Sequence, residues 1–125
     1  MRLFEPDPTS PEANLARIRA LITPRTKVIQ VSHVTCTTGL VLPVAAIARL
    51  AQSQGIWFHV DGAYGAAALC APSVKHLFVG IELADSFIVD PHKWLFGPFD
   101  CCALIYRDPD TARRAHTQRA EYLEV

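Results

Sequence analysis

The sequence lacks the features that mark several classes of protein. Its 12 basic and 12 acidic residues cancel, and neither sign gathers into a stripe or tail, which argues against a nucleic-acid partner. The apolar runs are far shorter than the roughly 18 residues that a membrane-spanning helix needs. The first twelve letters, MRLFEPDPTSPE, lack the apolar stretch of a secretory signal. We therefore expect a cytoplasmic protein with no membrane partner.

The cysteines are few in number, and their spacing does not suggest a metal site. The four cysteines are Cys36, Cys70, Cys101 and Cys102, and no C-x-x-C pair is present. Adjacent cysteines rarely pair with each other, so a disulfide framework is not indicated either. The favoured interpretation is four small, buried thiols in a reducing compartment.

The length of 125 residues allows one domain at most. Half of the residues are hydrophobic, and no repeat or low-complexity segment is present. Residues 1–10 contain Pro6 and Pro8 and are interpreted as an arm or linker, which leaves 11–125 as the folded part. Apolar spacing and Pro and Gly punctuation predict helices over 11–22, 43–53 and 108–118, a loop with a short helix over 66–80, and strands over 27–32, 56–60, 84–90 and 102–107.

Residues 27–60 form a strand-helix-strand pattern, which predicts two parallel strands with a right-handed connection. The second strand, IWFHV, is almost continuously apolar, as expected of a strand covered on both faces. The polar motif DGAYG follows it directly. Ligands bind just outside the carboxyl ends of strands in open α/β sheets, so Asp61 occupies a position suited to a ligand-binding acid.

A second polar motif, DPHKWLFGPFDCC, follows the strand predicted over 84–90. It places Lys93 near Asp61 if the two strands are neighbours. A carboxylate and a lysine suit pyridoxal phosphate, whose aldehyde forms an imine with an amine and whose ring nitrogen must stay protonated. Such a lysine must be neutral, which a partly desolvated site beside positive charge favours. Spacing alone leaves a turn-forming Asp61 and a surface Lys93 open as alternatives.

The segment from IWFHVDGAYGAAAL to DPHKWLFGPFDCCALIYRD resembles the group II pyridoxal-phosphate-dependent amino-acid decarboxylases, which act on aromatic amino acids, glutamate and related substrates. The resemblance covers roughly residues 44–125. The matching signature is Ser86-Phe87, five residues, Lys93-Trp94-Leu95, three residues, Phe99-x-Cys101, then Leu104 and Arg107. Residues 1–43 look more like class V aminotransferases and cysteine desulfurases, which share the same overall fold.

The resemblance implies a role for each matching residue. Lys93 would carry the imine, and Asp61 would pair with the pyridinium nitrogen. Ala63 would pack against one face of the ring, and His92 would lie at the phosphate side. Asp90, where relatives often carry Asn, would help to shape the phosphate site, with a backbone or capping role favoured because a carboxylate repels phosphate.

Four further residues are implied less directly. Tyr122 matches the tyrosine of the family's mobile loop, which acts as proton donor after carbon dioxide leaves. Cys36 stands where the decarboxylases have Thr and the class V enzymes Asn, contacting the ring hydroxyl of the cofactor. Because cysteine is a poorer hydrogen-bond partner, Thr35 or Thr38 would substitute.

The resemblance implies part of the fold-type I large domain, a three-layer α/β/α arrangement around a mostly parallel sheet. Relatives are several times longer and dimeric, so the chain corresponds to a central slice. We expect a decarboxylase of amino acids that is inactive as an isolated fragment. The alternatives are a class V aminotransferase-like or desulfurase-like enzyme, which also uses Lys93 and gives Tyr122 no role, and a truncated chain without catalysis.

Overall fold

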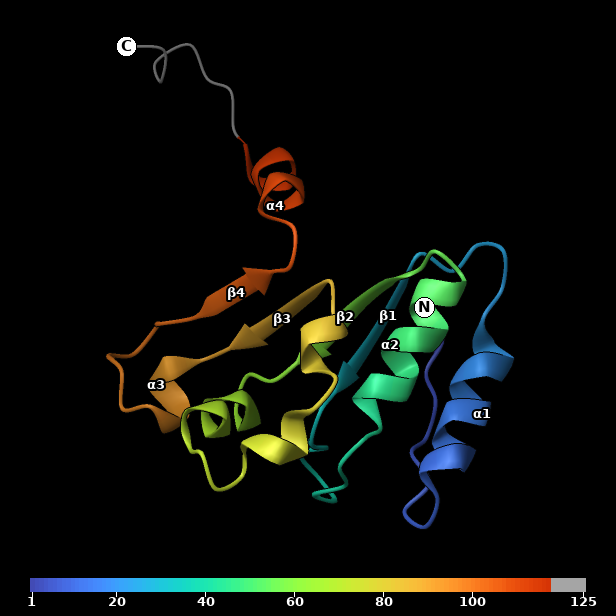
Figure 1. Ribbon diagram of the computed structural model, residues 1–125, viewed down its shortest axis with the longest axis horizontal. Helices are drawn as coiled ribbons and strands as arrows, with labels where there is room; N and C mark the ends of the chain where they lie inside the picture. Colours follow the sequence, from blue (N-terminus) through green and yellow to red (C-terminus); the bar gives the residue numbers. More distant parts are fainter. Residues whose placement is uncertain (118–125) are drawn as a thin grey trace.

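The computed structural model describes residues 1–117, which build a four-stranded sheet flanked by helices (Figure 1). The strands follow one another across the sheet in the order β1-β2-β3-β4. The first three strands run parallel, and the last is antiparallel to its neighbour. Their bounds are β1 Val28–Ser32, β2 Trp57–Asp61, β3 Ser86–Val89 and β4 Ala103–Tyr106.

The helices confirm three predictions and add a fourth element. The α-helices are α1 Pro11–Leu21, α2 Val44–Ser53, α3 Pro91–Trp94 and α4 Pro109–His116. Two 3-10 helices, η1 Gly65–Cys70 and η2 Lys75–Phe78, occupy the region predicted as a loop with one short helix, and a third, η3 Ile81–Leu83, follows it. The single turn α3 was not predicted. Among residues 1–117, no helix has the length and apolar character required to cross a membrane.

Two helices begin where an Asp or Ser precedes a proline. Ser10 accepts a hydrogen bond from the Ala13 amide at 3.0 Å, and Asp108 accepts one from the Asp110 amide at 3.0 Å. These bonds satisfy amide groups that lack partners within the first helical turn, while the following proline has no amide to satisfy. The same sequence signal occurs at Asp90-Pro91, where the structure uses the carboxylate differently, as described below.

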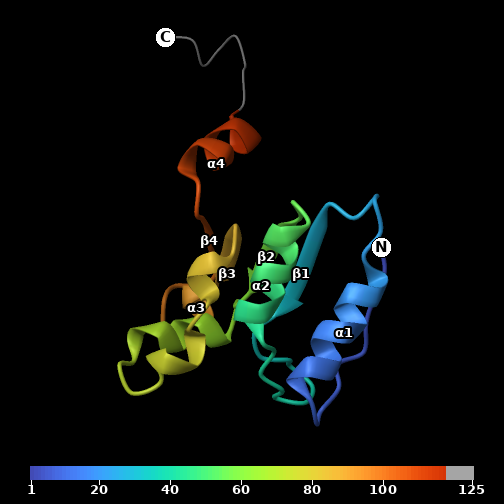
Figure 2. The same ribbon diagram turned by 45° about the vertical axis from the view of Figure 1, so that its right-hand side comes forward.

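The core lies between α2 and one face of the sheet. Phe58 and Val60 of β2 and Ile47 of α2 are fully buried. Burying one such side chain stabilises the fold by about 1.5–3 kcal/mol. In both ribbon views α1 lies beside α2 on this side of the sheet (Figures 1 and 2). The core therefore fixes β2, whose carboxyl end carries Asp61.

The other face of the sheet differs from the sequence prediction. In β2 the side chains of Trp57, His59 and Asp61 alternate with the buried ones and stay half-buried. Val28, on the edge strand β1, is 54% exposed. Helix α4 reaches this face through a contact with Tyr106, so strand 56–60 is covered here in part, less completely than its apolar sequence predicted. The alternation of buried and half-buried side chains along β2 is a better guide to which face is covered than the apolar composition of IWFHV.

A carboxylate ties the three strands β2, β3 and β4 together. Asp85, just before β3, accepts a hydrogen bond from the Phe58 amide at 2.8 Å and pairs with the Arg107 guanidinium. The Asp85 amide in turn donates to the Phe58 carbonyl at 2.9 Å. These contacts set the register that brings the carboxyl ends of β2 and β3 to the same edge.

The cysteines are not buried as expected. Cys36, Cys70, Cys101 and Cys102 are all exposed, and none of the four forms a disulfide. They lie in turns and at element ends, where the backbone runs over the surface. The expectation of buried thiols is therefore wrong. Within the described part of the chain, no group of three or more His, Cys, Asp or Glu residues could hold a metal ion.

Candidate functional site

The candidate site is formed where the parallel strands β2 and β3 end. Asp61 is the last residue of β2 and pairs with Ile88 of β3. Backbone pairing continues past the strands: the Gly62 amide donates to the Ile88 carbonyl at 3.1 Å, and the Asp90 amide donates to the Ala63 carbonyl at 2.9 Å. The two polar motifs are therefore held against each other by their backbones.

The turn after β2 requires glycine and fixes the Asp61 side chain. A Cβ atom on Gly62 would lie 2.6 Å from the Ala66 Cβ and 3.0 Å from the Ile88 carbonyl oxygen, so a larger residue would push the turn away from β3. One carboxylate oxygen of Asp61 accepts a hydrogen bond from the Ala63 amide at 3.1 Å. This local bond holds the carboxylate at the strand end.

Lys93 lies on α3, one turn after β3. Its Nζ atom is 2.8 Å from a carboxylate oxygen of Asp90, and the two side chains are 39% and 13% exposed. The hydrogen bond to Asp90 raises the pKa of Lys93, and the charge of Asp61 adds to this rise. The same bond lowers the pKa of Asp90. The charge of Asp61 therefore acts on Lys93. The sequence predicted a neutral lysine beside positive charge, whereas the structure shows an ammonium paired with a carboxylate.

The side chain of Asp90 does not cap α3. It pairs instead with Lys93, and the same carboxylate raises the pKa of the Cys102 thiol. The favoured capping role for Asp90 is therefore corrected: its backbone joins the turn, as the 2.9 Å bond to Ala63 shows, but its carboxylate is free for side-chain partners. The Asp90-Pro91 pair with a lysine three residues on could have suggested this contact.

His92 faces the turn that follows α3. Its Nδ1 atom lies 2.6 Å from the Cys101 carbonyl oxygen, and its ring meets the edge of Phe99 with centroids 5.6 Å apart. A Cβ atom on Gly97 would lie 3.2 Å from Pro91, which explains how the chain folds back so tightly onto the start of α3. The phosphate-side role of His92 stays a prediction.

Sequence reasoning missed an aromatic contact between the two motifs. Tyr64, after β2, and Trp94, in α3, stack with ring centroids 5.3 Å apart and planes 15° from parallel. The rings are exposed to 63% and 46%. The stack joins the Asp61 turn to the Lys93 turn on the outside of the molecule. The sequence did contain a signal for this contact, because one aromatic residue follows the end of β2 and another follows the end of β3.

His33 is a second residue that the sequence reasoning missed. It follows β1, is 3% exposed, and donates its backbone amide to the Asp61 carbonyl at 3.1 Å. Its ring packs edge-on against Phe78, and Nδ1 has no hydrogen-bond partner. Burial lowers the pKa of His33, so the neutral ring is favoured.

The remaining predicted residues are not brought to Lys93 by any described contact. The Thr35 hydroxyl accepts a hydrogen bond from the Leu40 amide at 3.0 Å and bonds to the Thr38 hydroxyl at 2.5 Å, so it serves the turn after β1. Cys36 is exposed in the same turn. Tyr122 lies outside the described residues. The roles given to Ala63, Thr35, Cys36 and Tyr122 stay predictions.

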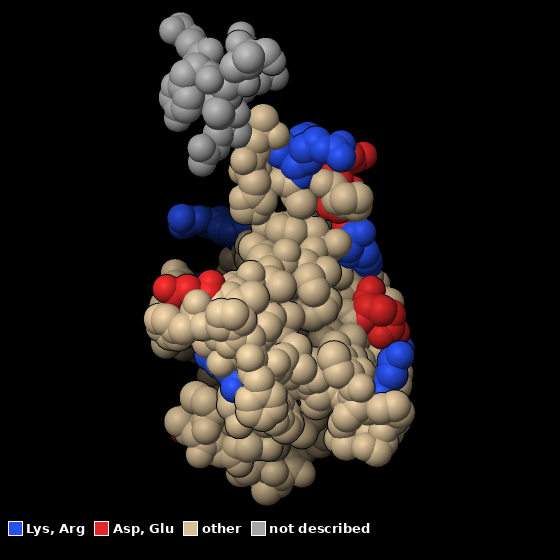
Figure 3. Space-filling model, turned by 90° about the vertical axis from the view of Figure 1, so that its left-hand side faces the viewer, with Lys and Arg blue, Asp and Glu red and all other residues tan. Residues whose placement is uncertain are grey.

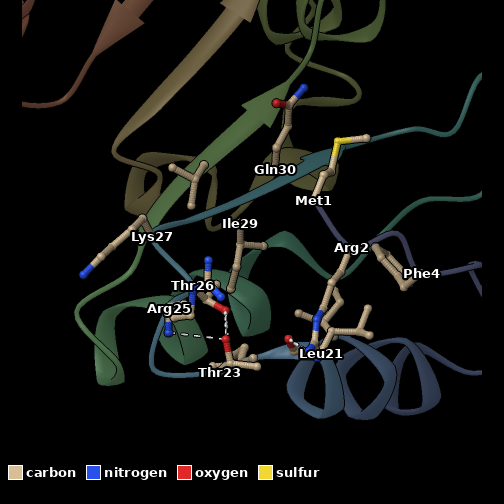
Figure 4. Close-up of a pocket in the computed structure, with 13 residues that line it drawn as sticks. Met1, Arg2, Phe4, Leu21, Thr23, Arg25, Thr26, Lys27, Ile29 and Gln30 are labelled. Carbon is tan, nitrogen blue, oxygen red and sulfur yellow. Dashed lines mark hydrogen bonds between the residues drawn. The ribbon is translucent and has the colours of Figure 1, made fainter.

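A cleft of about 500 Å³ lies elsewhere, between the end of α1 and the start of β1 (Figure 4). Arg2, Arg25 and Lys27 are among the residues that line it. It is at the amino end of β1, whereas Asp61 and Lys93 follow the carboxyl ends of their strands. We locate the chemistry at the strand ends, because the paired carboxylate and amine are there and the cleft offers no such pair.

Comparison with known proteins identifies the family. The pyridoxal-dependent decarboxylase conserved domain matches residues 24–125. The chain belongs to the pyridoxal-dependent decarboxylase family. The match includes residues 24–43, a segment whose sequence looks more like class V aminotransferases.

The decarboxylase relatives are similar over most of this chain. Tryptophan decarboxylase TDC1 of Camptotheca acuminata is 40% identical over 90 residues, 72% of this chain and 18% of that protein. L-tyrosine/L-DOPA decarboxylase 2 of Lophophora williamsii is 39% identical over 90 residues, again 72% of this chain and 17% of that protein. The chain thus spans less than a fifth of the length of these relatives.

Solved structures place the fold in the same family. The apo form of mouse CSAD superposes with a TM-score of 0.74 at 32% identity, covering 90% of this chain and 24% of that one. The structure of Oryza sativa TDC with PLP and tryptamine gives a TM-score of 0.74 at 33% identity, covering 92% and 23%. The sheet described here is therefore part of the fold-type I large domain, as predicted.

The residues at the strand ends fit pyridoxal phosphate. Asp61 offers a fixed carboxylate, which the protonated ring nitrogen requires, and Lys93 offers a primary amine from the neighbouring strand. Ala63, between them in the backbone pairing, is small enough to leave room for a flat ring. This donor set matches the cofactor that the decarboxylase family uses.

Proposed function

We propose that this chain supplies the lysine and the ring-nitrogen carboxylate of a pyridoxal-phosphate-dependent amino-acid decarboxylase. One observation carries the proposal: Asp61 and Lys93 follow neighbouring parallel strands whose backbones remain paired beyond the strand ends. Membership of the decarboxylase family and relatives named for tryptophan, tyrosine and DOPA support an amino acid as substrate.

Bound pyridoxal phosphate supplies an electron sink for the pair of electrons left when a carboxylate departs as carbon dioxide. Asp61 would hold a proton on the ring nitrogen, because a nearby carboxylate favours the charged form of that nitrogen. Lys93 would bind the cofactor through its amine, Ala63 would face the ring, and His92 would lie toward the phosphate. These roles use residues that one edge of the sheet carries.

Two assignments rest on the resemblance. Tyr122 would deliver a proton to the substrate carbon once carbon dioxide has left. Cys36, or Thr35 or Thr38 in its place, would approach the ring hydroxyl. For Thr35 this requires the turn to release a hydroxyl that now bonds to Leu40 and Thr38.

We also propose that the full-length protein is a cytosolic homodimer. Four exposed cysteines without a disulfide partner suit a reducing compartment, where such thiols stay free. Large apolar side chains remain exposed after α3, with Phe96 at 93% and Phe99 at 85%, and the side of the molecule formed by β4 and α3 carries few charges (Figure 3). Apolar patches of this kind are characteristic of protein–protein contacts.

Cofactor capture tests the proposal directly. The chain is incubated with pyridoxal phosphate, reduced with borohydride and digested, and the modified lysine is identified by mass spectrometry. We expect the adduct at Lys93 and not at Lys27 or Lys75, and we expect Asp61→Asn to reduce its yield. Absence of an adduct at Lys93, in a chain whose circular dichroism shows it folded, would contradict the proposal and favour a non-catalytic chain.

Turnover tests the reaction class in the full-length protein. Release of carbon dioxide and amine from carboxyl-labelled tryptophan, tyrosine or glutamate is the expected outcome. Tyr122→Phe should slow this release, with the matched control Tyr106→Phe leaving it nearly unchanged. Unchanged turnover in Tyr122→Phe would remove the proton-donor role, and amino-group transfer without carbon dioxide would favour the class V alternative.

A further inference from the structure

The carboxylate of Asp90 stands out because it is diverted from the role that its sequence position predicts. Ser10 and Asp108 also precede a proline at a helix start, and both cap their helices with the side chain. Asp90 makes no such bond, and its backbone is held by the Ala63 carbonyl on one side and the Lys93 amide on the other. Its carboxylate is thereby presented to Lys93 and Cys102.

The contact with Lys93 opposes the chemistry that a cofactor lysine performs. An amine bonds to an aldehyde carbon only when it is neutral, with a free lone pair. In this structure the Lys93 nitrogen lies 2.8 Å from Asp90, whose side chain is only 13% exposed. The Asp90 contact is also the main reason that the pKa of Lys93 is raised. The ion pair must open and the ammonium must lose its proton before the lysine can react.

We propose that Asp90 is a positioning residue that retains the Lys93 ammonium at the strand end, and so sets the rate at which this lysine takes up an aldehyde. In that step the ammonium first gives its proton to solvent. The neutral nitrogen then bonds to the aldehyde carbon, its two hydrogens pass as protons through solvent to the aldehyde oxygen, and that oxygen leaves as water. The inference rests on the proposed function in one respect, that the aldehyde taken up in the cell is the cofactor's.

The thiol of Cys102 provides an independent reporter of the same carboxylate. The Asp90 carboxylate is the main cause of its raised pKa. A thiolate, not a thiol, reacts with alkylating agents. If Asp90 controls both neighbours, removing its charge should therefore activate Cys102 as well as Lys93.

The first experiment measures lysine reactivity without any cofactor. Trace acetylation by acetic anhydride is followed by mass spectrometry between pH 7 and 11, with Lys27 and Lys75 as references in the same sample. In Asp90→Asn we expect the half-maximal pH of Lys93 to fall, and its rate at pH 8 to rise about twofold or more, since the neutral fraction of an amine below its pKa grows about tenfold per unit. Asp90→Glu, which keeps the charge, should restore slow acetylation.

The matched control is Asp110→Asn. Asp110 pairs with Arg113 at 2.8 Å with the same three-residue spacing, but on α4. This variant should leave the pH profile of Lys93 unchanged. An unchanged Lys93 profile in Asp90→Asn, in a protein with native circular dichroism, would overturn the inference, as would an equal change in the control.

The second experiment separates the lysine effect from repulsion of the phosphate. Rates of adduct formation at Lys93 are compared for pyridoxal and pyridoxal phosphate. Faster uptake of both by Asp90→Asn supports the inference, whereas faster uptake of pyridoxal phosphate alone would assign Asp90 to the phosphate and overturn it. No adduct in any variant would refute the proposed cofactor role, while the acetylation profile would still decide the role of Asp90.

The third measurement uses the thiol. Alkylation of Cys102 by iodoacetamide at pH 7.5 should accelerate in Asp90→Asn, with Cys36 as the internal reference. Acceleration at Cys102 together with Lys93 is the result expected of one shared carboxylate. An unchanged rate at Cys102 would show that Asp90 does not control this cluster.

Discussion

Gly80 is the position where one methyl group should damage the fold most selectively. It precedes η3 with φ of +99°, a left-handed backbone that favours glycine. A Cβ atom built there would lie 2.3 Å from the Ala45 Cβ and 2.7 Å from the Ala45 Cα, in the first turn of α2. Gly80→Ala therefore combines an unfavourable backbone with an overlap that no side-chain rotation relieves.

The expected loss can be built from three terms. A left-handed non-glycine residue costs about 1–2 kcal/mol, and overpacking a tight contact costs about 1–3 kcal/mol. The lower entropy of the unfolded alanine chain offsets about 0.4–1 kcal/mol. Gly80→Ala should thus lower the free energy of unfolding by roughly 1–5 kcal/mol, with about 3 kcal/mol from the middle of each range, a large fraction of the stability of a domain of this size.

Gly55 supplies the matched control. Its φ is +62°, but a Cβ atom there would meet nothing within 4 Å. Gly55→Ala carries only the backbone cost of about 1–2 kcal/mol, partly offset, so a loss of roughly 1 kcal/mol is expected. Urea unfolding followed by tryptophan fluorescence and circular dichroism gives both values. Equal losses at the two positions would refute the close contact between η3 and α2.

Two further predictions concern Asp85, which joins β2, β3 and β4, and the buried His33. Asp85→Ala should lower the free energy of unfolding by about 1–3 kcal/mol, because it leaves the Phe58 amide without its partner. Arg107→Ala removes a half-exposed side chain and should cost under about 1 kcal/mol in the same urea assay. The reverse order would contradict the role given to Asp85 in joining the strands. Burial lowers the pKa of His33 in the folded chain. Between that lowered pKa and the pKa of about 6.5 in the unfolded chain, the unfolded chain binds more protons than the folded one. The contribution of His33 to stability should therefore be complete above about pH 7 and fall as the pH drops below the unfolded value. His33→Gln should flatten this dependence, with a residual slope from His59, whose pKa burial also lowers. An unchanged slope in His33→Gln would exclude His33 as its source.

Much of the fold could be predicted because its local signals agree with its packing. The helix at Ser10-Pro11 and the helix that ends before Gly55 begin and end at capping and breaking residues, and the structure follows them to within a few residues. Periodicity could not show that β4 turns back antiparallel to β3, since strand direction depends on the turn. That turn places Phe96 and Asp100 at positive φ, and the identity of these two residues does not predict that backbone conformation.

The candidate site was predictable in position but not in detail. Strand ends followed by polar motifs put Asp61 and Lys93 at one edge, because parallel strands end together. The Asp90–Lys93 pair and the Tyr64–Trp94 stack depend on side-chain directions that spacing does not determine. Cysteine exposure was mispredicted because composition reports how often a residue type is buried, not where the chain leaves the core.

The charges at the strand ends are unbalanced. Asp61 and Asp90 bring two carboxylates to this edge, and Lys93 brings one ammonium that already pairs with Asp90. A phosphate carries about −1.5 to −2 charge near neutral pH and needs several hydrogen-bond donors. Of the described residues here, His92 is bound to the Cys101 carbonyl, so a phosphate would meet more negative than positive charge. Among residues 1–117, this edge thus offers an amine and a ring-nitrogen partner, and its excess of negative charge would oppose a phosphate.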